Sequence, residues 1–354
     1  MPFIAAASKI DFPDKIPQQD VKNYARSLFE PSFPQIERII SAFDNTEIQF
    51  RNFCRPIDFY ATLTTFQQRN DEYVRCALEY SIQATNECLL KADITREAIT
   101  DIIFVSSTGL ATPSIDALII NKMRLSPNTR RTPVFGLGCA GGVSGMAKAN
   151  LFAKANPDAV VLLIAVELCS LTFLQNDFSK SNFIASGLFS DGVAACIIKG
   201  DAHDKENKNH KVTYIAARSK LYYDSLDVMG WEFLDSGFKV IFSQDIPTII
   251  HKNVSADATA FLEIHNLQLP DIKNFIFHPG GKKVLTAYTE ALQAEGDFLK
   301  NTREVMNAYG NMSSATVLYV LEKFMQEGFE PGYGLMAALG PGFSSEMVLL
   351  EKQL

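Results

Sequence analysis

The chain has 354 residues, of which 47% are hydrophobic and 21% charged, a length and composition typical of a soluble globular enzyme with one large core or two packed halves. Its net charge of −7 disfavours a nucleic-acid partner, so an anionic ligand would need a local basic patch. Six scattered cysteines without C-x-x-C or zinc-type histidine spacing argue against a disulfide framework and a metal site, and favour a reducing compartment.

The first hundred residues predict an opening strand followed by helices. Apolar spacing places helices around Gln19–Leu28 and Pro34–Phe43 and a longer one over Thr65–Ala92. Two arginines, Arg51 and Arg55, form a basic and aromatic spot between these helices, for which a solvated loop is the simplest interpretation. The opening residues lack the features of a signal peptide, and no segment is apolar for long enough to span a bilayer, so we expect a cytoplasmic protein.

The next hundred residues alternate strands and helices. Asp101–Val105 is typical of a buried strand, and Ser114–Leu125 of a helix with proline near its first turn. The apolar run Ala159–Val166 predicts a fully buried strand, and Leu188–Lys199 a hairpin-like strand pair. The polar stretch Gly200–Lys211 follows, and we interpret it as a linker between two halves.

A glycine-rich turn within this first half carries a single cysteine. The segment GLGCAGG joins a short apolar run to a helix of small residues over Val143–Ala155 and places Cys139 at the start of that helix. Backbone N–H groups at a helix N-terminus favour negative charge, so we expect this thiol to be shifted toward the nucleophilic thiolate. The glycines would let a substrate carbonyl approach backbone donors. A buried structural cysteine in a tight turn is the alternative interpretation.

The same letters fit a second motif. Gly136, Gly138 and Gly141 spell the dinucleotide-binding fingerprint G-x-G-x-x-G, with Asp158 as a ribose-binding acid. However, Asp158 precedes its predicted strand, and the fingerprint stands more than one hundred residues into the chain instead of in a first βαβ unit. An NAD-binding oxidoreductase that uses Gly136–Gly141 therefore remains as the alternative from a different class.

The second half repeats the order of the elements of the first. Its predicted elements are helix Ile246–His265, strand Asn274–Phe277, helix Lys283–Ala294, helix Ser313–Met325 and a closing strand pair over Gly334–Leu350. The strand ends in His278, and a turn at Gly310-Asn311 precedes the last helix. A βα pattern that runs twice predicts an α/β fold with two similar sheets and a site where the halves meet.

This repeated order places three chemically distinct side chains on equivalent loops. Cys139, His278 and Asn311 stand at strand ends or helix starts that would converge between the halves. As a thiolate, Cys139 would accept an acyl group. His278 would pair with that thiolate and later donate a hydrogen bond to a thioester oxygen, and Asn311 would donate to the same oxygen without titrating.

Several motifs support this interpretation together. GCAGG around Cys139, FHPGG around His278, YGNMSSA around Asn311 and GPGF near the C-terminus occur in this order, together with STGLATPS at 107–114 and GLFSDG at 187–192. In this combination the chain resembles the type III polyketide synthases, the chalcone synthase-like branch of the thiolase superfamily. The resemblance implies a thiolase-like α/β fold in which two similar βαβαβ-type halves, residues 1–202 and 211–354, pack as α/β/α/β/α layers.

The resemblance also implies an activity. Cys139 would load an acyl-CoA starter, while His278 and Asn311 would promote decarboxylation of malonyl-CoA by stabilising the enolate that attacks the loaded acyl group. After such decarboxylative Claisen condensations the product would cyclise to a pyrone, a resorcinol or a phloroglucinol-type ring. The family uses CoA thioesters as substrates with no further cofactor and no metal, and it implies a homodimer.

Further residues match positions of the family's cavity. Phe189 matches an aromatic gatekeeper between the CoA tunnel and the cavity. Its usual second aromatic falls at or near Val240, where a smaller side chain would widen the passage. Thr112 matches a residue that reaches the partner subunit's cavity. The other matched cavity positions are Ser107, Cys169, Thr172, Ser313, Gly340, Pro341 and Gly342, and the basic positions that match CoA contacts are Arg51, Arg55, Lys282 and Lys283.

Two alternatives inside the superfamily fit less well. A ketoacyl synthase III-like enzyme, which condenses once, would carry an HQAN-like sequence where this chain has FHPGG. A biosynthetic thiolase would need a second catalytic cysteine near the C-terminus, and no cysteine follows Cys196. Within the favoured family, the small or apolar side chains of Val240 and Cys169 suggest a fatty acyl-CoA starter.

Overall fold

The computed structural model describes residues 1–30, 36–203, 211–243, 246–294 and 296–353. The strands are β1 (Phe3–Lys9), β2 (Asp14–Pro17), β3 (Phe50–Phe53), β4 (Asp101–Val105), β5 (Arg130–Val134), β6 (Val160–Leu168), β7 (Asp191–Lys199), β8 (Val212–Leu221), β9 (Met229–Leu234), β10 (Gly237–Phe242), β11 (Ile272–Phe277), β12 (Gly332–Gly340) and β13 (Ser344–Lys352). The helices are α1 (Gln18–Phe29), α2 (Ile36–Asp44), α3 (Phe66–Lys91), α4 (Ile115–Met123), α5 (Gly141–Ala155), α6 (Lys180–Leu188), α7 (Ile246–Glu263), α8 (Lys282–Leu292), α9 (Lys300–Tyr309) and α10 (Thr316–Glu327).

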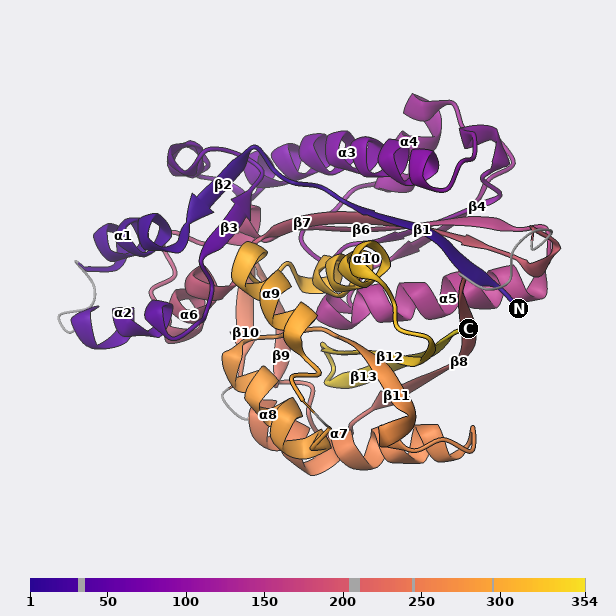
Figure 1. The fold of residues 1–354 in the computed structure, drawn as a ribbon. Helices are drawn as coiled ribbons and strands as arrows, with labels where there is room; N and C mark the ends of the chain where they lie inside the picture. The colour runs from indigo at the N-terminus through magenta and orange to yellow at the C-terminus, as the bar shows by residue number, and fades with distance from the viewer. Residues whose placement is uncertain (31–35, 204–210, 244–245, 295, 354) are drawn as a thin grey trace.

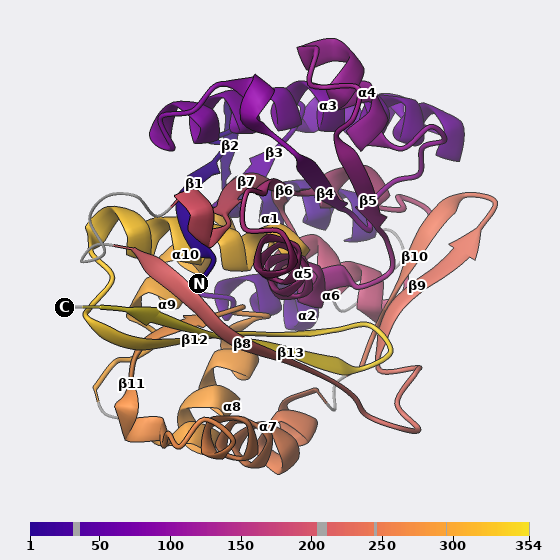
Figure 2. The ribbon, with the colours of Figure 1, turned by 90° about the vertical axis from the view of Figure 1, so that its right-hand side faces the viewer.

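Five layers of secondary structure stack on one another (Figures 1 and 2). One sheet has the order β1-β7-β6-β4-β5 and the other the order β11-β12-β13-β8. Helices α5 and α10 lie between the sheets, α3 and α4 cover one outer face, and α7 and α8 cover the other. In each sheet a parallel pair, β4–β6 or β11–β12, continues into antiparallel neighbours. The expected thiolase-like α/β/α/β/α arrangement is confirmed.

The two sheets are joined at one edge. Strand β1 pairs with β8 over only Phe3–Thr213 and Ile4–Val212, and this short contact makes the hydrogen-bonded ladder continuous through nine strands. Away from that edge the sheets separate around α5, whose small residues allow close packing. A Cβ atom on Gly145 would lie 2.7 Å from Leu163 Cδ1 in β6. Glycine is therefore required where the central helix meets the sheet.

Most of the predicted elements are confirmed within a few residues. Strand Asp101–Val105 has the predicted bounds, and α3 begins after Thr65, whose side chain forms a capping box with Gln68. The predicted helix Ser313–Met325 starts as a 3-10 turn over Ser313–Ala315 before it becomes α10. The first two residues of the predicted helix Pro34–Phe43 and most of the linker Gly200–Lys211 lie outside the described residues.

The predicted hairpin over Leu188–Lys199 is wrong. Helix α6 ends at Leu188, and a single strand, β7, follows it. The partners of β7 are β1 and β6, which lie far from it in the sequence, so the local pattern of apolar residues could not reveal them.

The sequence pattern also missed helix α9 and the β9–β10 hairpin. Searched over the described segments, the helices include none with the length and apolar character needed to cross a membrane.

Candidate active site

Cys139 lies at an elbow between β5 and α5. It belongs to a 3-10 turn over Gly138–Ala140 that leads directly into the helix. Gly138 adopts φ +44°, and a Cβ atom there would lie 2.7 Å from Cδ of Pro341. A Cβ atom on Gly340 would likewise lie 2.4 Å from the carbonyl oxygen of Leu137. The elbow and the loop of Gly340, Pro341 and Gly342 therefore pack in direct contact.

A chain of hydrogen bonds connects the three predicted catalytic loops. The thiol of Cys139 donates to Oγ of Ser313 at 3.5 Å. The Ser313 N–H donates to Oδ1 of Asn311 at 2.9 Å, and Nδ2 of Asn311 donates to the carbonyl oxygen of Gly280 at 2.9 Å. Gly280 stands two residues after His278. The cysteine, asparagine and histidine loops thus meet, as the sequence predicts.

The backbone of Asn311 is fixed beside Phe189. Its N–H donates to the carbonyl of Leu188 at 3.0 Å, and its carbonyl accepts from the N–H of Ser190 at 2.8 Å. These two contacts form an isolated parallel bridge between Phe189 and Asn311. The backbone is therefore fixed by these two bonds, and the side-chain amide by its bonds with Ser313 and Gly280. The second hydrogen on Nδ2 of Asn311 can then donate to a ligand.

His278 is buried at the end of β11. Its backbone N–H donates to the carbonyl of Ala337 at 2.8 Å, which ties the loop to β12. Neither ring nitrogen has a hydrogen-bond partner among the described residues. Burial lowers the pKa of the imidazole to about 3, so the ring is neutral near pH 7. The neutral ring can donate a hydrogen bond from one nitrogen and accept one at the other.

Burial of Cys139 acts against the expected thiolate, which stays a prediction. Burial raises the pKa of its thiol to about 12, the hydrogen bond with Ser313 opposes that rise, and the charge of Glu167 adds to it. A helix N-terminus typically stabilises an anion by only about 0.3–1 kcal/mol, which is too little to offset full desolvation. In this arrangement the sulfur of Cys139 contacts Oγ of Ser313.

Glu167 is a buried acid that sequence reasoning missed. It lies near the end of β6. Its carboxylate accepts a hydrogen bond from the N–H of Ser107 at 3.0 Å and another from Oγ of Ser314 at 2.5 Å. Oγ of Ser107 in turn accepts from the N–H of Gly138 at 3.1 Å. Burial raises the pKa of Glu167 to about 7. An acid inside the otherwise apolar run VVLLIAVEL was the available signal, because such an acid must find partners when it is buried.

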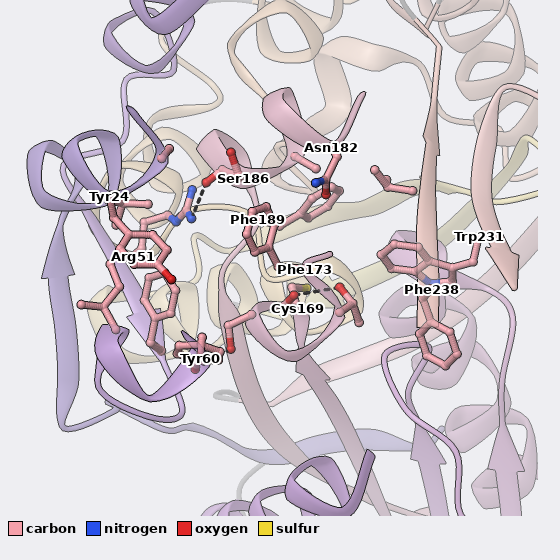
Figure 3. Close-up of a pocket in the computed structure, with 18 residues that line it drawn as sticks. Tyr24, Arg51, Tyr60, Cys169, Phe173, Asn182, Ser186, Phe189, Trp231 and Phe238 are labelled. Carbon is pink, nitrogen blue, oxygen red and sulfur yellow. Dashed lines mark hydrogen bonds between the residues drawn. The ribbon is translucent and has the colours of Figure 1, made fainter. Parts of the chain in front are cut away.

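Two cavities flank the gatekeeper position. The inner cavity has a volume of about 70 Å³ and is lined by Phe189, Val240, Cys169 and Thr172, as predicted, and also by Arg51 (Figure 3). The outer cavity has a volume of about 420 Å³; the described residues that line it include Leu188, Phe242, Gly280, Gly281, Lys180, Lys282 and Lys283. Val240 and Phe189 therefore share one cavity.

An aromatic pair stands between these cavities. The rings of Phe189 and Phe242 meet edge to face, with centroids 6.3 Å apart, and each ring lines a different cavity. Phe242 follows Val240 by two residues on β10, a spacing that places both on the same face of the strand. The ring next to Phe189 thus comes from Phe242, and the widening expected from the small Val240 side chain is offset at this point.

The predicted basic residues separate into two groups. Lys282 and Lys283 line the outer cavity, and Lys282 pairs with Glu47 at 3.0 Å. Arg51 is 3% exposed and points into the inner cavity, whereas Arg55 forms an ion pair with Glu72. The two arginines do not line the cavity of the lysines, and their contact with CoA phosphates stays a prediction. Thr112 lies apart from the other predicted site residues, in a groove lined also by Leu110 and Phe135.

This fold, with its converging cysteine, histidine and asparagine loops, defines a condensing acyltransferase. Residues 56–202 match the family model "Chalcone and stilbene synthases, N-terminal domain", and residues 215–353 match the corresponding C-terminal domain. The chain belongs to the chalcone and stilbene synthase family, the type III polyketide synthases.

Individual relatives agree with this assignment. The chain is 45% identical over 341 residues to a putative chalcone synthase of Bacillus subtilis (strain 168), covering 94% of this chain and 93% of that protein. It is 37% identical to 1,3,6,8-tetrahydroxynaphthalene synthase of Streptomyces peucetius subsp. caesius, with coverage of 86% and 80%. The crystal structure of 1,3,6,8-tetrahydroxynaphthalene synthase from Streptomyces coelicolor A3(2) superimposes with a TM-score of 0.93 at 27% identity, covering 99% of both chains.

The NAD-binding alternative is therefore wrong. Beyond the family match, the protein itself fills the space at two of the three fingerprint glycines. A Cβ atom on Gly141 would lie 2.6 Å from Val105 and 3.2 Å from Ser314, and one on Gly138 would meet Pro341. These two glycines serve the packing of the cysteine elbow, so the backbone there is not open to a pyrophosphate.

Proposed function

We propose that this enzyme transfers an acyl group from an acyl-CoA starter to Cys139 and extends it by decarboxylative Claisen condensation with malonyl-CoA. The extended chain then cyclises to a pyrone, resorcinol or phloroglucinol-type product. The observation that carries the proposal is the hydrogen-bonded chain from Cys139 through Ser313 and Asn311 to Gly280, beside the buried His278.

In the loading step, the sulfur of Cys139 attacks the thioester carbonyl of the starter. The thiol proton passes to the neutral imidazole of His278, whose ring nitrogens lack partners among the described residues. The C–S bond to CoA then breaks, and the CoA sulfur takes the proton back from His278.

In the extension step, malonyl-CoA loses its carboxylate as carbon dioxide, and the electron pair moves onto the thioester as an enolate. The N–H of His278 and the second Nδ2 hydrogen of Asn311 donate to the enolate oxygen. The enolate carbon attacks the acyl carbonyl on Cys139, and the cysteine sulfur leaves. A buried oxyanion donor of this type typically contributes about 10²–10³-fold to the rate.

The outer cavity is the proposed entrance for CoA thioesters. Lys282 and Lys283 at its wall supply positive charge for phosphate groups, and the Phe189–Phe242 pair supports a gate toward the inner cavity. The inner cavity would hold the acyl group. The apolar Val240 and the small Cys169 on its wall support a fatty acyl starter.

We also propose that the enzyme is a homodimer that buries the groove around Thr112. Leu110 and Phe135 are 42% and 48% exposed there, and apolar side chains of this size favour burial. Phe135→Asp is expected to convert a dimer into a monomer in analytical ultracentrifugation. A wild-type protein that sediments as a monomer at micromolar concentration would contradict the proposal.

The experiment that tests the activity is incubation with malonyl-CoA and a panel of acyl-CoA starters. We expect carbon dioxide release, an acyl group on Cys139 by mass spectrometry, and products extended more than once. Cys139→Ala should lose the acyl-enzyme. Absence of both signals in the wild type, or both signals unchanged in Cys139→Ala, would refute the proposal. Products that stop after one condensation would instead favour the ketoacyl synthase III-like alternative.

A further inference from the structure

Arg51 is a buried cation whose hydrogen-bonding capacity is only partly used. Its Nη2 donates to the carbonyl oxygen of Ser186 in α6 at 2.7 Å. Its Nε and Nη1 have no hydrogen-bond partner among the described residues, although the residue is only 3% exposed. Leaving buried donors of a charged group unpaired is costly, so such an arrangement calls for an acceptor.

The surroundings of Arg51 hold its side chain in a defined place. A Cβ atom on Gly310 would lie 3.0 Å from Cδ of Arg51, so its stem passes close to the residue that precedes Asn311. Its guanidinium lies 5.6 Å from the ring centroid of Phe53. Burial lowers the pKa of Arg51 to about 10, which leaves the guanidinium charged near pH 7. The cation is thus held beside the catalytic asparagine loop.

Asp191 is the buried acid whose charge acts on Arg51, yet it does not bond to the guanidinium. Its oxygens accept from the N–H of Cys54 at 2.7 Å, the N–H of Ser170 at 2.8 Å and the hydroxyl of Ser170 at 2.6 Å. The carboxylate is therefore occupied by other donors. It offsets part of the charge of Arg51 without satisfying its N–H groups.

Arg51 is one of the residues that line the inner cavity, where a bound acyl chain would lie close to its guanidinium. Among the described residues that line it, Arg51 is the charged side chain, and most of the others are apolar or aromatic (Figure 3). The hydroxyl of Thr172 donates to the carbonyl oxygen of Cys169, and the hydroxyl of Ser186 donates to that of Phe183. The charge of Arg51 also lowers the pKa of the Cys169 thiol against the rise caused by burial, so its field reaches the wall of the cavity.

We propose that Arg51 determines starter specificity by binding a carboxylate on the acyl group held in the inner cavity. A carboxylate is favoured over a neutral carbonyl because a desolvated cation forms its strongest hydrogen bonds with an anionic oxygen. The enzyme would then accept dicarboxylic acyl-CoA starters that carry a free acid at the end distant from the thioester. This inference rests on the proposed function, since it presupposes an acyl group on Cys139.

The test compares glutaryl-CoA, which has a free terminal acid, with its neutral monomethyl ester and with pentanoyl-CoA. The rate of acyl transfer to Cys139 is measured by quenched-flow mass spectrometry. We expect the wild type to load glutaryl-CoA about tenfold or more faster than the methyl ester. Arg51→Met and Arg51→Gln should each lower the glutaryl rate by about tenfold or more and leave the pentanoyl rate within about twofold.

Two variants and one control separate the effect of the positive charge of Arg51 from a general loss of structure. Arg51→Gln keeps a donor for the Ser186 carbonyl, so it separates the loss of charge from the loss of that bond. The control is Arg75→Met, which removes a half-exposed guanidinium that pairs with Glu72 on α3, and it should change neither rate. If both Arg51 variants fail to fold, as judged by circular dichroism, the wild-type comparison of acid and methyl ester decides the question.

Several results would overturn the inference. Equal wild-type rates for the acid and its methyl ester, or variants that slow all three starters equally, would limit Arg51 to holding α6 through Ser186. If the variants load every starter normally but release shorter products, Arg51 would act on the extended chain and not on the starter. A wild type that loads no starter and releases no carbon dioxide would refute the proposed function itself, a result distinct from normal loading without preference for the acid.

Discussion

The rings of Phe189 and Phe242 meet edge to face with centroids 6.3 Å apart, and they belong to two different cavities. Phe189 follows helix α6, and Phe242 ends strand β10, so the contact depends on elements far apart in the sequence. The outer cavity carries lysines and the inner cavity carries apolar side chains. A polar cofactor arm and an acyl chain would thus be separated by a pair of aromatic rings.

Removal of one ring should open this separation. In Phe242→Ala, we expect water to reach the loaded acyl group, so that the fraction of hydrolysed, unextended acid rises several-fold in the product mixture. The loss of the ring pair itself is worth about 0.5–1.5 kcal/mol beyond the lost area. Product analysis by mass spectrometry checks this. Phe233→Ala removes a ring that is 58% exposed on β9 and should leave the products unchanged.

Asn311 should matter for extension much more than for loading. In Asn311→Ala, the rate of malonyl-CoA decarboxylation should fall about 10²–10³-fold because one oxyanion donor is lost. Acyl transfer from the starter to Cys139 should remain within about tenfold of the wild type. Carbon dioxide release and acyl-enzyme formation are measured separately. Equal losses in both steps would show that Asn311 acts by shaping the elbow through Ser313.

The reactivity of Cys139 should rise steeply with pH. Because burial raises the pKa of its thiol to about 12, alkylation by iodoacetamide should be slow at pH 7 and still increase above pH 9. Ser313→Ala removes the hydrogen bond that lowers this pKa, so it should slow alkylation further at each pH. A rate that levels off near pH 7 in the wild type would contradict a buried thiol.

His278 and Glu167 should have opposite effects on stability as pH changes. The folded-state pKa of His278 lies near 3, below its ordinary value of 6.5, so protonation of the unfolded chain destabilises the fold as pH falls below 6.5. The folded-state pKa of Glu167 lies near 7, above its ordinary 4.5, so this group stabilises the fold as pH falls below 7. Between pH 4.5 and 6.5 the two contributions cancel.

Single substitutions should reveal each contribution. Relative to the wild type, the free energy of unfolding of Glu167→Gln should fall on acidification by about 1.4 kcal/mol per pH unit in that window, because the histidine effect remains alone. His278→Gln should show the reverse slope. Urea unfolding between pH 4.5 and 6.5 provides the measurement. Parallel curves for all three proteins would mean that neither pKa is shifted.

The cysteine elbow allows a matched glycine test. Gly138 and Gly136 both have positive φ, at +44° and +88°, but only Gly138 faces Pro341, while a Cβ atom on Gly136 would meet nothing within 4 Å. Gly136→Ala should cost about 1–2 kcal/mol for backbone strain alone. Gly138→Ala should cost more and also slow loading of Cys139. Thermal unfolding and acyl-enzyme formation check the pair, and equal effects would rule out the packing argument.

The sequence by itself determined most of the elements and the order of the candidate reactive groups. The bounds of β4 and the course of α3 and α5 followed from local periodicity and capping, which depend on neighbouring residues only. The repeated order of strands and helices placed Cys139, His278 and Asn311 on equivalent loops, and the structure brings these loops together through Ser313 and Gly280.

Tertiary structure alone decided the electrostatics and the cavities. The ionisation of Cys139 and His278 could not be predicted from local sequence because desolvation depends on every residue packed around a group. Burial raises the thiol pKa of Cys139 and lowers the imidazole pKa of His278. For the same reason the burial of Arg51 in the wall of the inner cavity and the position of Phe242 beside Phe189 depend on contacts between distant segments. Burial and contact between distant segments are properties of the packed fold, and no local pattern of residues encodes them.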